Sequence, residues 1–252
     1  METIALITGA NKGIGYETAR LLAAQGVRVL VGARDAGRGQ AAADQLGERA
    51  RFVPLDVTDA ASIAAAAKFI DSEYGHLDIL VNNAGIARME GDPETDGFGV
   101  PSKATVDTLR ETYETNVFGV VAVTNAMLPL LKHAPAARIV NVSSGVGSLA
   151  SMTDPDGPLY ALTALSYPSS KSALNMITAQ YAKEFRDTPI KINAANPGYC
   201  ATDLNGHSGP RTAEQGAQVV LELATLGPDG PTGILWGQDD TVTESRHIPV
   251  PW

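Results

Sequence analysis

The sequence predicts an α/β fold: one domain over residues 1–252, with a doubly wound parallel sheet of about seven strands flanked by helices. Three observations predict this fold. Short apolar runs of strand length alternate with segments of helical period along the whole chain. A glycine-rich turn joins the first apolar run to the first helical segment, and no linker divides the chain. Strands that alternate with helices in this way form parallel sheets.

The elements are expected in a regular order. The pattern predicts strands near residues 3–8, 27–32, 51–55, 77–81, 137–143, 190–195 and 232–236. It predicts helices near residues 14–25, 37–46, 60–74, 103–114, 117–132, 167–186 and 212–225. Right-handed crossovers between such strands produce a Rossmann-like topology, whose ligands bind at the carboxyl ends of the strands.

The first strand, turn and helix form a candidate phosphate site. An apolar run that ends at Thr8 is followed by Gly9, Gly13 and Gly15, and then by a helical pattern. Glycines let the backbone approach a pyrophosphate, and helix N-terminal amides bind anions without a dedicated cation. The spacing differs from the commoner Gly-x-Gly-x-x-Gly fingerprint, and a glycine-rich turn between any strand and helix is the alternative interpretation.

Tyr167 and Lys171 are four residues apart in an expected helix and therefore share one face. A cation about 5 Å from a phenol favours the phenolate by roughly 3 kcal/mol, or about two pKa units, at an effective dielectric of ~20. The pair is a candidate proton donor at neutral pH. Taken alone, such a pair is also typical of a solvated helix face. Tyr160 lacks this cation, because Ala164 lies four residues after it.

Composition excludes several classes of function. The net charge of −9 is spread along the chain without a basic block, so neither nucleic acid nor an anionic membrane is an expected partner. The longest apolar segments are strand-sized and the first residues lack a signal-peptide layout, which predicts a cytoplasmic protein. The four histidines lack metal-ligand spacing and Cys200 is the single cysteine, so no metal site and no internal disulfide are expected.

Six motifs follow one another along the chain: Thr8-Gly9-x-x-x-Gly13-x-Gly15, Asn82-Asn83-Ala84-Gly85, Asn116, Asn141-Val142-Ser143-Ser144, Tyr167-x-x-x-Lys171 and Pro197-Gly198. In this order they resemble the short-chain dehydrogenase/reductase family over essentially the whole chain. The turn from Gly9 to Gly15, the residues Ala33-Arg34-Asp35 and the final Trp252 are most similar to its carbonyl-reductase group. The resemblance implies an oxidoreductase that acts on a small carbonyl or alcohol compound.

The end of the second strand bears on the choice of cofactor. Asp35 has the position after Gly15 of an acid that binds a ribose 2′-hydroxyl in NAD enzymes. In the family that this chain resembles, however, this acid lies at the tip of the strand, where this chain has Ala33. Arg34 follows, and a guanidinium matches a 2′-phosphate in a bidentate contact, with Lys12 as a second cation. The resemblance therefore implies NADP(H) rather than NADH.

The resemblance also implies the remaining cofactor contacts. The segment Asn83-Ala84-Gly85 is similar to one that supports the sheet and lies against the adenine ribose, and Thr202 to a partner of the carboxamide. Asp59 is expected to cap a helix, a role that Asp56 would otherwise have. Cys200 lies either near the nicotinamide or in the core as a small apolar side chain. The expected contacts are Gly9, Asn11, Lys12, Gly13, Ile14, Gly15, Arg34, Asp56, Val57, Asn83, Ala84, Gly85, Tyr167, Lys171, Pro197, Gly198 and Thr202.

The catalytic residues implied by the resemblance are Asn116, Ser144, Tyr167 and Lys171. Tyr167 would give a proton to the substrate carbonyl while NADPH delivers hydride to its carbon. Lys171 would lower the pKa of the tyrosine and hold the nicotinamide ribose, and Ser144 would hydrogen-bond the carbonyl oxygen. Asn116 would position a water that continues the proton path. Ser143 is expected to face the other way.

Two long segments bear on the substrate. Ser144 and Tyr167 are farther apart than is usual in the family, and the segment 148–166 is rich in apolar residues. The segment 86–101 follows a strand whose end points at the cofactor. Each is expected either to line the substrate pocket or to be a surface excursion. Aldehydes and ketones with apolar substituents are the favoured substrates.

Two further expectations concern assembly and the class of function. Helices 103–132 and 167–186 commonly form a subunit interface in the family, which favours a homodimer or homotetramer. Some relatives keep the nucleotide fold but act as redox-sensing proteins, and these usually lose the tyrosine or the lysine. Because Tyr167 and Lys171 are both present, an enzyme is favoured over a sensor.

Overall fold

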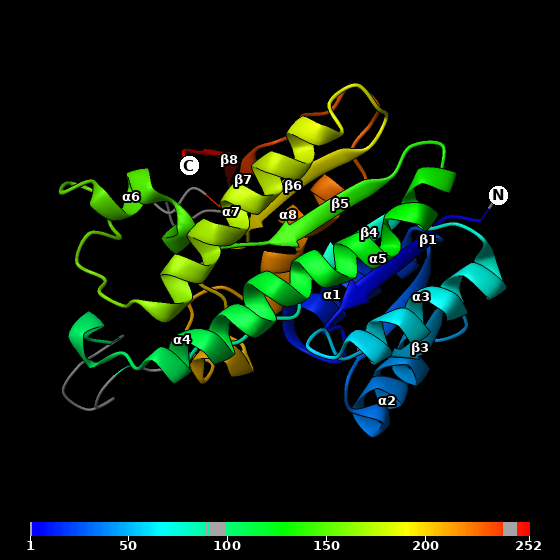
Figure 1. Cartoon of the computed structure of the whole chain (residues 1–252), viewed down its shortest axis with the longest axis horizontal. Coiled ribbons are helices and arrows are strands. Elements are labelled where there is room, and N and C mark those ends of the chain that lie inside the picture. Colours follow the sequence, from blue (N-terminus) through cyan, green and yellow to red (C-terminus); the bar gives the residue numbers. More distant parts are fainter. Residues whose placement is uncertain (1, 89, 91–98, 239–245) are drawn as a thin grey trace.

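The computed structural model describes residues 2–88, 90, 99–238 and 246–252. Within them, the strands form one sheet in the order β3-β2-β1-β4-β5-β6-β7-β8, parallel except for the antiparallel pair β7–β8 (Figure 1). The order of strands reverses at β1: β2 and β3 follow on one side of it and β4, β5 and β6 on the other, and this is the switch point of a doubly wound sheet. The strands are β1 Ile4–Thr8, β2 Arg28–Ala33, β3 Ala50–Pro54, β4 Ile79–Asn82, β5 Arg138–Val142, β6 Lys191–Asn196, β7 Leu235–Gln238 and β8 His247–Val250.

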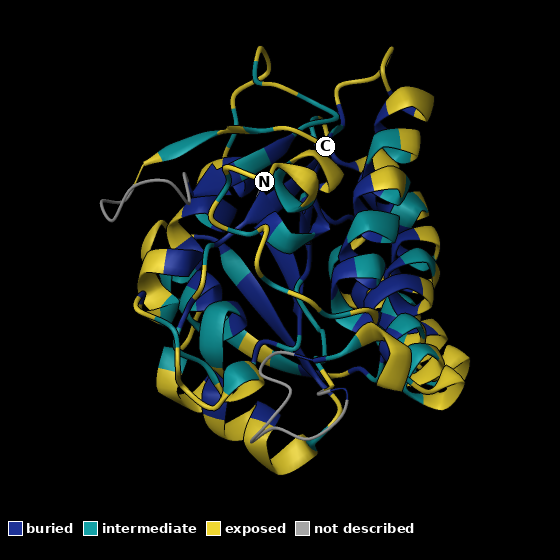
Figure 2. Ribbon diagram, turned by 90° about the vertical axis from the view of Figure 1, so that its left-hand side faces the viewer, coloured by how far each residue is buried: buried dark blue, intermediate teal, exposed yellow. Residues whose placement is uncertain are grey.

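Two hydrophobic cores cover the two faces of the sheet. Successive side chains of a strand point to opposite faces, and in β1 Ile4 and Leu6 belong to one core while Ala5 and Ile7 belong to the other. Figure 2 shows the buried sheet between helices whose outer surfaces are exposed. The first core includes α3 Ala60–Tyr74, α5 Gly119–His133 and α7 Ser166–Glu184; the second includes α1 Gly13–Ala24, α2 Ala36–Leu46 and α8 Ala213–Ala224.

The predicted fold class is confirmed, and the structure adds to it a strand, a short α-helix and a π-helical turn, besides short 3-10 turns. The short strand β8 extends the sheet at the edge of β7, and its Pro249 and few apolar residues gave no strand signal. A short helix, α6 Leu149–Thr153, lies in the long segment before Tyr167. The helices expected at 103–114 and 117–132 form one continuous run, α4 Val106–Tyr113 and α5, joined by the π-helical turn Glu114–Phe118.

This run, Val106–His133, is long and apolar enough by length and composition to cross a membrane, the single such helix in the described part of the chain. Half of its apolar window is buried inside the protein. Val123, Met127 and Leu131 are fully covered and belong to the core under α5. Its packing is that of a core helix that lies against a sheet.

Candidate active site

The predicted site residues gather at one edge of the sheet. Strands β1, β4, β5 and β6 are parallel neighbours, so their carboxyl ends lie on the same side. Each of these strands ends within two residues of a predicted site residue. These residues are Gly9 after β1, Asn83 after β4, Ser144 after β5 and Pro197 after β6. This edge of a doubly wound sheet is where ligands bind.

The glycine turn is held against the end of β4. Gly9 has φ +64° and Gly13 has φ +58°, values that side chains other than glycine rarely adopt. A Cβ on Gly15 would lie 2.3 Å from Nδ2 of Asn83. That amide donates to the carbonyls of Thr8 and Gly9, at 2.9 and 3.2 Å. Asn83 thus fixes the turn, as expected of a segment that supports the sheet.

Thr8 is a residue whose role the sequence did not reveal. Its hydroxyl oxygen accepts hydrogen bonds from the backbone N–H groups of Asn83 and Ala84, at 3.0 and 2.9 Å. The threonine therefore ties the last residue of β1 to the chain after β4. The signal was its place in the first motif, where it stands directly before Gly9.

The N-terminus of α1 lacks a capping side chain. Lys12 occupies the N-cap position without a side-chain hydrogen bond, and the first turn carries no acidic residue. Unpaired N–H groups at a helix start bind anions. Asn11 and Ile14, both partly buried, complete the segment from Gly9 to Gly15. The backbone of this turn therefore fits the pyrophosphate of a dinucleotide.

The end of β2 carries the residues on which the expected cofactor choice depends. The strand ends at the buried Ala33, and the next residue, Arg34, is exposed. Asp35 caps α2 instead of facing a ribose: its Oδ1 accepts from the backbone N–H of Arg38 at 2.8 Å. That hydrogen bond, with the Arg38 side chain as a further cause, lowers the pKa of Asp35.

Asp56 and Val57 follow β3 near Arg34. Oδ1 of Asp56 accepts from the backbone N–H and the hydroxyl of Thr58, at 2.9 and 2.8 Å. The Thr58 backbone most strongly, and the guanidinium of Arg34 to a smaller extent, lower the pKa of Asp56. Asp59 caps α3, as expected, by accepting from the N–H of Ala61. Arg34 and Asp56 therefore lie near one another at the end where adenosine is expected.

Lys12 is engaged differently from the expectation. Its ammonium forms an ion pair with Asp203, in the segment after β6, and Asp203 also lies 2.9 Å from Nε2 of His207. The hydrogen bond from Lys12, with its charge, lowers the pKa of Asp203. Both partners of the Lys12 pair are half-exposed, so the pair is weak. A cofactor phosphate would compete with Asp203 for this cation.

The segment after β6 lies beside the glycine turn. Gly198 has φ +73°, and its N–H donates to Oδ1 of Asn196 at 3.1 Å. The same oxygen accepts from the N–H of Gly145 at 2.9 Å, which joins the ends of β5 and β6. Cγ2 of Thr202 would lie 3.6 Å from a Cβ on Gly13. Thr202, one of the three expected contacts in this segment with Pro197 and Gly198, therefore lies beside the glycine turn.

Cys200 behaves as a small core side chain. It is 4% exposed, and its thiol donates to the carbonyl of Pro197 at 3.4 Å. Of its two expected roles, the packed one agrees with this burial.

Tyr167, Ser144 and Lys171 form one cluster. Ser144 follows β5, Tyr167 lies in the first turn of α7, and the Ser144 side chain is close enough to lower the pKa of the Tyr167 phenol. The Lys171 ammonium lies 5.5 Å from the centre of the Tyr167 ring and donates to the carbonyl of Val142 at 2.8 Å. Ser143 faces away, as expected: it is buried and donates to Oδ1 of Asn175 at 2.6 Å.

The electrostatics of this cluster differ from the expectation based on charge alone. Burial raises the pKa of Tyr167 to about 12, and the Ser144 hydroxyl opposes that rise. Burial also lowers the pKa of Lys171 to about 8. Desolvation disfavours the phenolate and the ammonium alike, and it is the largest cause of both shifts. Tyr167 is therefore a protonated phenol at neutral pH, suited to donate a proton.

Asn116 lies in the π-helical turn and is 1% exposed. Its amide donates to the carbonyl of Ile86 at 2.9 Å and to the hydroxyl of Ser170 at 3.1 Å, and its Oδ1 accepts from the N–H of Ile86. The side chain thus joins the segment after β4 to α7, so a water-positioning role would fall to the backbone of Asn116 and stays a prediction. A Cβ on Gly85 would lie 3.4 Å from Oδ1 of Asn116 and 3.8 Å from Nζ of Lys171.

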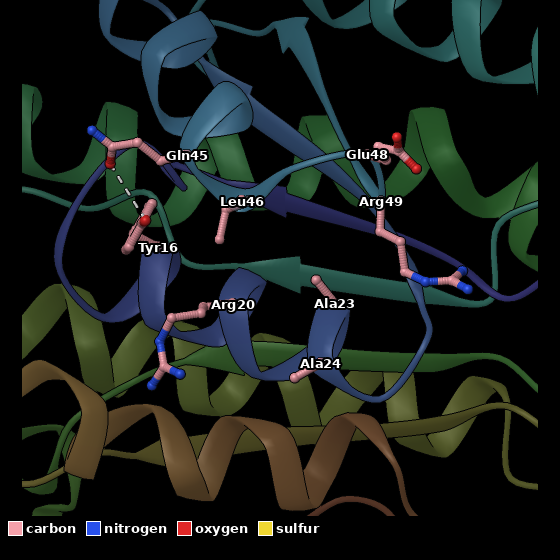
Figure 3. A pocket seen from close by; sticks show the side chains of 8 residues that line it. All are labelled: Tyr16, Arg20, Ala23, Ala24, Gln45, Leu46, Glu48 and Arg49. Atoms are coloured by element: carbon pink, nitrogen blue, oxygen red, sulfur yellow. Dashed lines mark hydrogen bonds between the residues drawn. The ribbon is translucent and has the colours of Figure 1, made fainter.

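Three further observations concern the surroundings of the site. A surface hollow of about 480 Å³ beside α1 and α2 is lined by none of the predicted site residues (Figure 3). Within the described residues, no three His, Cys, Asp or Glu side chains form a group that would hold a metal ion. Of the segment 86–101, which was expected to line the pocket or to be a surface excursion, residues 89 and 91–98 lie outside the described part.

Comparison with known proteins assigns the chain to a family. The family model for short chain dehydrogenases matches residues 3–213. A short-chain dehydrogenase, anuI, of Penicillium roqueforti is 39% identical over 251 residues, 96% of each chain. The solved structure of salutaridine reductase from Papaver somniferum aligns with a TM-score of 0.80 at 30% identity, over 93% of this chain and 99% of that one. An NADPH-bound carbonyl reductase from chicken fatty liver gives a TM-score of 0.80 at 30% identity, over 94% and 97%. The chain belongs to the short-chain dehydrogenase/reductase family.

Proposed function

We propose that this protein reduces an aldehyde or a ketone to an alcohol, with NADPH as the hydride donor and Tyr167 as the proton donor. The observation that carries the proposal is the cluster of Ser144, Tyr167 and Lys171. It lies at the same sheet edge as the uncapped start of α1. The likeness to an NADPH-bound carbonyl reductase supports the same reaction.

Each residue of the cluster has a task in the proposed reaction. When bound, NADPH supplies the hydride. Tyr167 holds a proton at its hydroxyl across neutral pH, because its pKa is about 12, and gives it to the carbonyl oxygen of the substrate. Ser144 hydrogen-bonds that oxygen as negative charge develops on it. Lys171, an ammonium at neutral pH, stabilises the phenolate that remains.

The preference for NADPH is proposed from Arg34. Its guanidinium is exposed at the end of β2, and within the described residues it makes no hydrogen bond or ion pair. Asp35, the residue that would favour NADH, is committed to the cap of α2. A guanidinium at this position pairs with a 2′-phosphate and gains nothing from a 2′-hydroxyl.

The proposed substrates carry apolar substituents. Several large apolar side chains are exposed in the segments next to the catalytic cluster, although such side chains are usually buried. They are Leu149, Tyr160 and Leu165 before Tyr167, Tyr199 and Leu204 after β6, and the final Trp252. The backbone carbonyl of Trp252 accepts from the N–H of Ala150, so the chain end lies against α6.

We also propose a homodimer or homotetramer that buries the outer faces of α5 and α7. Phe118 is 54% exposed and Met176 is 60% exposed on this surface. A hollow of about 640 Å³ is lined there by Val121 of α5 and by Met176, Ile177 and further residues at the C-terminal end of α7. Sedimentation of the wild-type chain tests this: a monomer at micromolar concentration would contradict the proposal.

The test of the proposed function is cofactor oxidation with a panel of aromatic, terpenoid and aliphatic ketones and aldehydes. The wild type is expected to oxidise NADPH in preference to NADH. The variant Tyr167→Phe is expected to lose activity by roughly 10²–10⁴-fold, the usual contribution of a general acid. Tight NADPH binding without turnover on any compound would instead favour a cofactor-sensing protein.

A further inference from the structure

Glu90 lies buried at the start of the catalytic helix. Its side chain comes from the segment after β4, yet it is 3% exposed. Its carboxylate accepts from the backbone N–H of Leu165 at 2.6 Å and of Ser166 at 2.5 Å. Leu165 is the N-cap residue of α7 and has no capping side chain, and Ser166 stands directly before Tyr167. The carboxylate of Glu90, which is distant in sequence, therefore accepts the hydrogen bonds at the start of this helix that a capping side chain would otherwise accept.

The chain around Glu90 is shaped to fit this carboxylate. Gly99 has φ +144°, and a Cβ there would lie 3.1 Å from Cβ and 3.4 Å from Oε2 of Glu90. The N–H of Val100 donates to the carbonyl of Glu90 at 3.2 Å. The hydroxyl of Thr163 donates to the carbonyl of Gly99 at 3.0 Å. Gly99, which packs against Glu90, thus also binds the chain that leads into α7.

The same segment is joined to α7 at a second place, through Asn116. That side chain connects Ile86, four residues before Glu90, to Ser170 near the start of the helix. Tyr167 lies between the two attachments, since Glu90 binds the backbone just before it and Asn116 binds the side chain of Ser170, three residues after it. The position of the phenol therefore depends on both.

We propose that Glu90 is a positioning residue that holds Tyr167 in reach of Ser144 and Lys171. This inference rests on the proposed function, because it assigns to Tyr167 the role of proton donor. Glu90 does not touch the reacting atoms; it acts by satisfying the two N–H groups that precede the tyrosine. A displacement of about 1 Å in a catalytic group costs on the order of a hundredfold in rate.

The test compares Glu90→Gln and Glu90→Ala with Asp59→Ala, a matched control that removes a carboxylate cap from α3, a helix that carries none of the catalytic residues. In Glu90→Ala, kcat is expected to fall by roughly a hundredfold while the KM for NADPH changes by less than about twofold. Glu90→Gln keeps one acceptor oxygen for these N–H groups, so it is expected to recover roughly tenfold of that loss. Asp59→Ala is expected to lower the Tm to a similar degree and to leave kcat unchanged.

A second measurement does not depend on turnover. Hydrogen exchange of the Leu165 and Ser166 amides is expected to quicken by about tenfold in Glu90→Ala and to stay unchanged in Asp59→Ala. Unchanged exchange at these two amides overturns the proposal, whether or not the enzyme is active. Equal loss of kcat in Glu90→Ala and Asp59→Ala also overturns it. If exchange at these amides quickens in Glu90→Ala but the wild type reduces no carbonyl compound, the result would instead contradict the proposed function.

Discussion

Two helices begin at the candidate active site, and they differ in how their first N–H groups are satisfied. Neither α1 nor α7 has a capping side chain of its own. At α7 the carboxylate of Glu90 closes the end from a distant segment. At α1 the N-cap is Lys12, and no acidic residue stands in the first turn. Other long helices have ordinary caps: Asp35 for α2, Asp59 for α3, Thr105 for α4 and Thr212 for α8.

The difference separates two tasks. An open helix end attracts an anion from outside, which suits the pyrophosphate of a dinucleotide. A helix start whose N–H groups are already hydrogen-bonded within the protein is held in place instead. This suits Tyr167, because proton transfer from a side chain depends on its position. We infer that α1 binds the cofactor and that α7 performs the proton transfer.

The largest effect on cofactor affinity is expected when the N-terminus of α1 receives a carboxylate, as the N-terminus of α7 has from Glu90. Lys12→Asp would cap the helix and stabilise the protein by about 1 kcal/mol. It would also place a negative charge where a phosphate is expected, which raises the Kd for NADPH by roughly a hundredfold. Fluorescence titration measures this. Lys12→Ala is the control, since it removes the cation without closing the helix end; an equal loss in both variants would contradict the role of the open end.

A smaller effect is expected at the adenosine end of the same cofactor. Arg34→Ala removes the guanidinium after β2, and a hydrogen bond to a charged group is worth about 1.5–3 kcal/mol, so the Kd for NADPH should rise by roughly 10–100-fold. The Kd for NADH should change by less than about twofold, because NADH has no 2′-phosphate for Arg34 to bind. Parallel titrations with the two cofactors check this, and equal losses for both would refute the assignment of Arg34.

The buried cation behind the closed end of α7 predicts a pH dependence. Lys171 has a pKa of about 8 when folded, below its ordinary value of 10.5, so carbonyl reduction should slow as the pH rises through about 8. Burial of the charged Lys171 also lowers the free energy of unfolding. This loss is largest below pH 8, where the buried group is charged, and it disappears as the pH rises toward 10.5. Lys171→Met should abolish turnover but raise the free energy of unfolding at pH 7 by about 1–3 kcal/mol.

Denaturant unfolding at pH 7 and at pH 10 measures that difference. The gain in Lys171→Met should be largest at pH 7 and should shrink at pH 10. A gain that is equal at both pH values would show that the burial of the charge is not its cause.

The smallest effect is expected from the ion pair at the open end of α1. Asp203→Asn removes the carboxylate that now holds Lys12. The freed ammonium should strengthen NADPH binding by up to about fivefold, the equivalent of an exposed ion pair. Titration at low and at high salt checks this, because the gain should decrease as salt screens the charges. Weaker binding in Asp203→Asn would mean that the pair supports the site instead of competing with the cofactor.

Most of the fold follows from the sequence because its signals are local. Alternating apolar runs and helical periods predicted the parallel strands, and a glycine turn located the open helix end. β8 was not predicted, because it is short and pairs only with β7 at the edge of the sheet. The π-helical turn at Asn116 also has no periodic signal, since it merely continues the helices on either side.

The candidate site shows where such reasoning ends. Glu90 and Leu165 are 75 residues apart and share no pattern in the sequence. The partner of Lys12, Asp203, is likewise known only from the folded chain. For Tyr167 the sequence reveals the nearby cation but not the burial of the phenol. Burial decides the direction of the pKa shift of Tyr167.

Binding of the cofactor by α1 and proton donation from α7 are tested most directly by measuring NADPH affinity and turnover together in wild type, Lys12→Asp and Tyr167→Phe. We predict that Lys12→Asp loses roughly a hundredfold in affinity but keeps its kcat at saturating NADPH. We predict that Tyr167→Phe binds NADPH within about threefold of wild type and loses at least about a hundredfold in kcat. Loss of affinity by the same factor in both variants, or turnover that survives in Tyr167→Phe, would contradict the account.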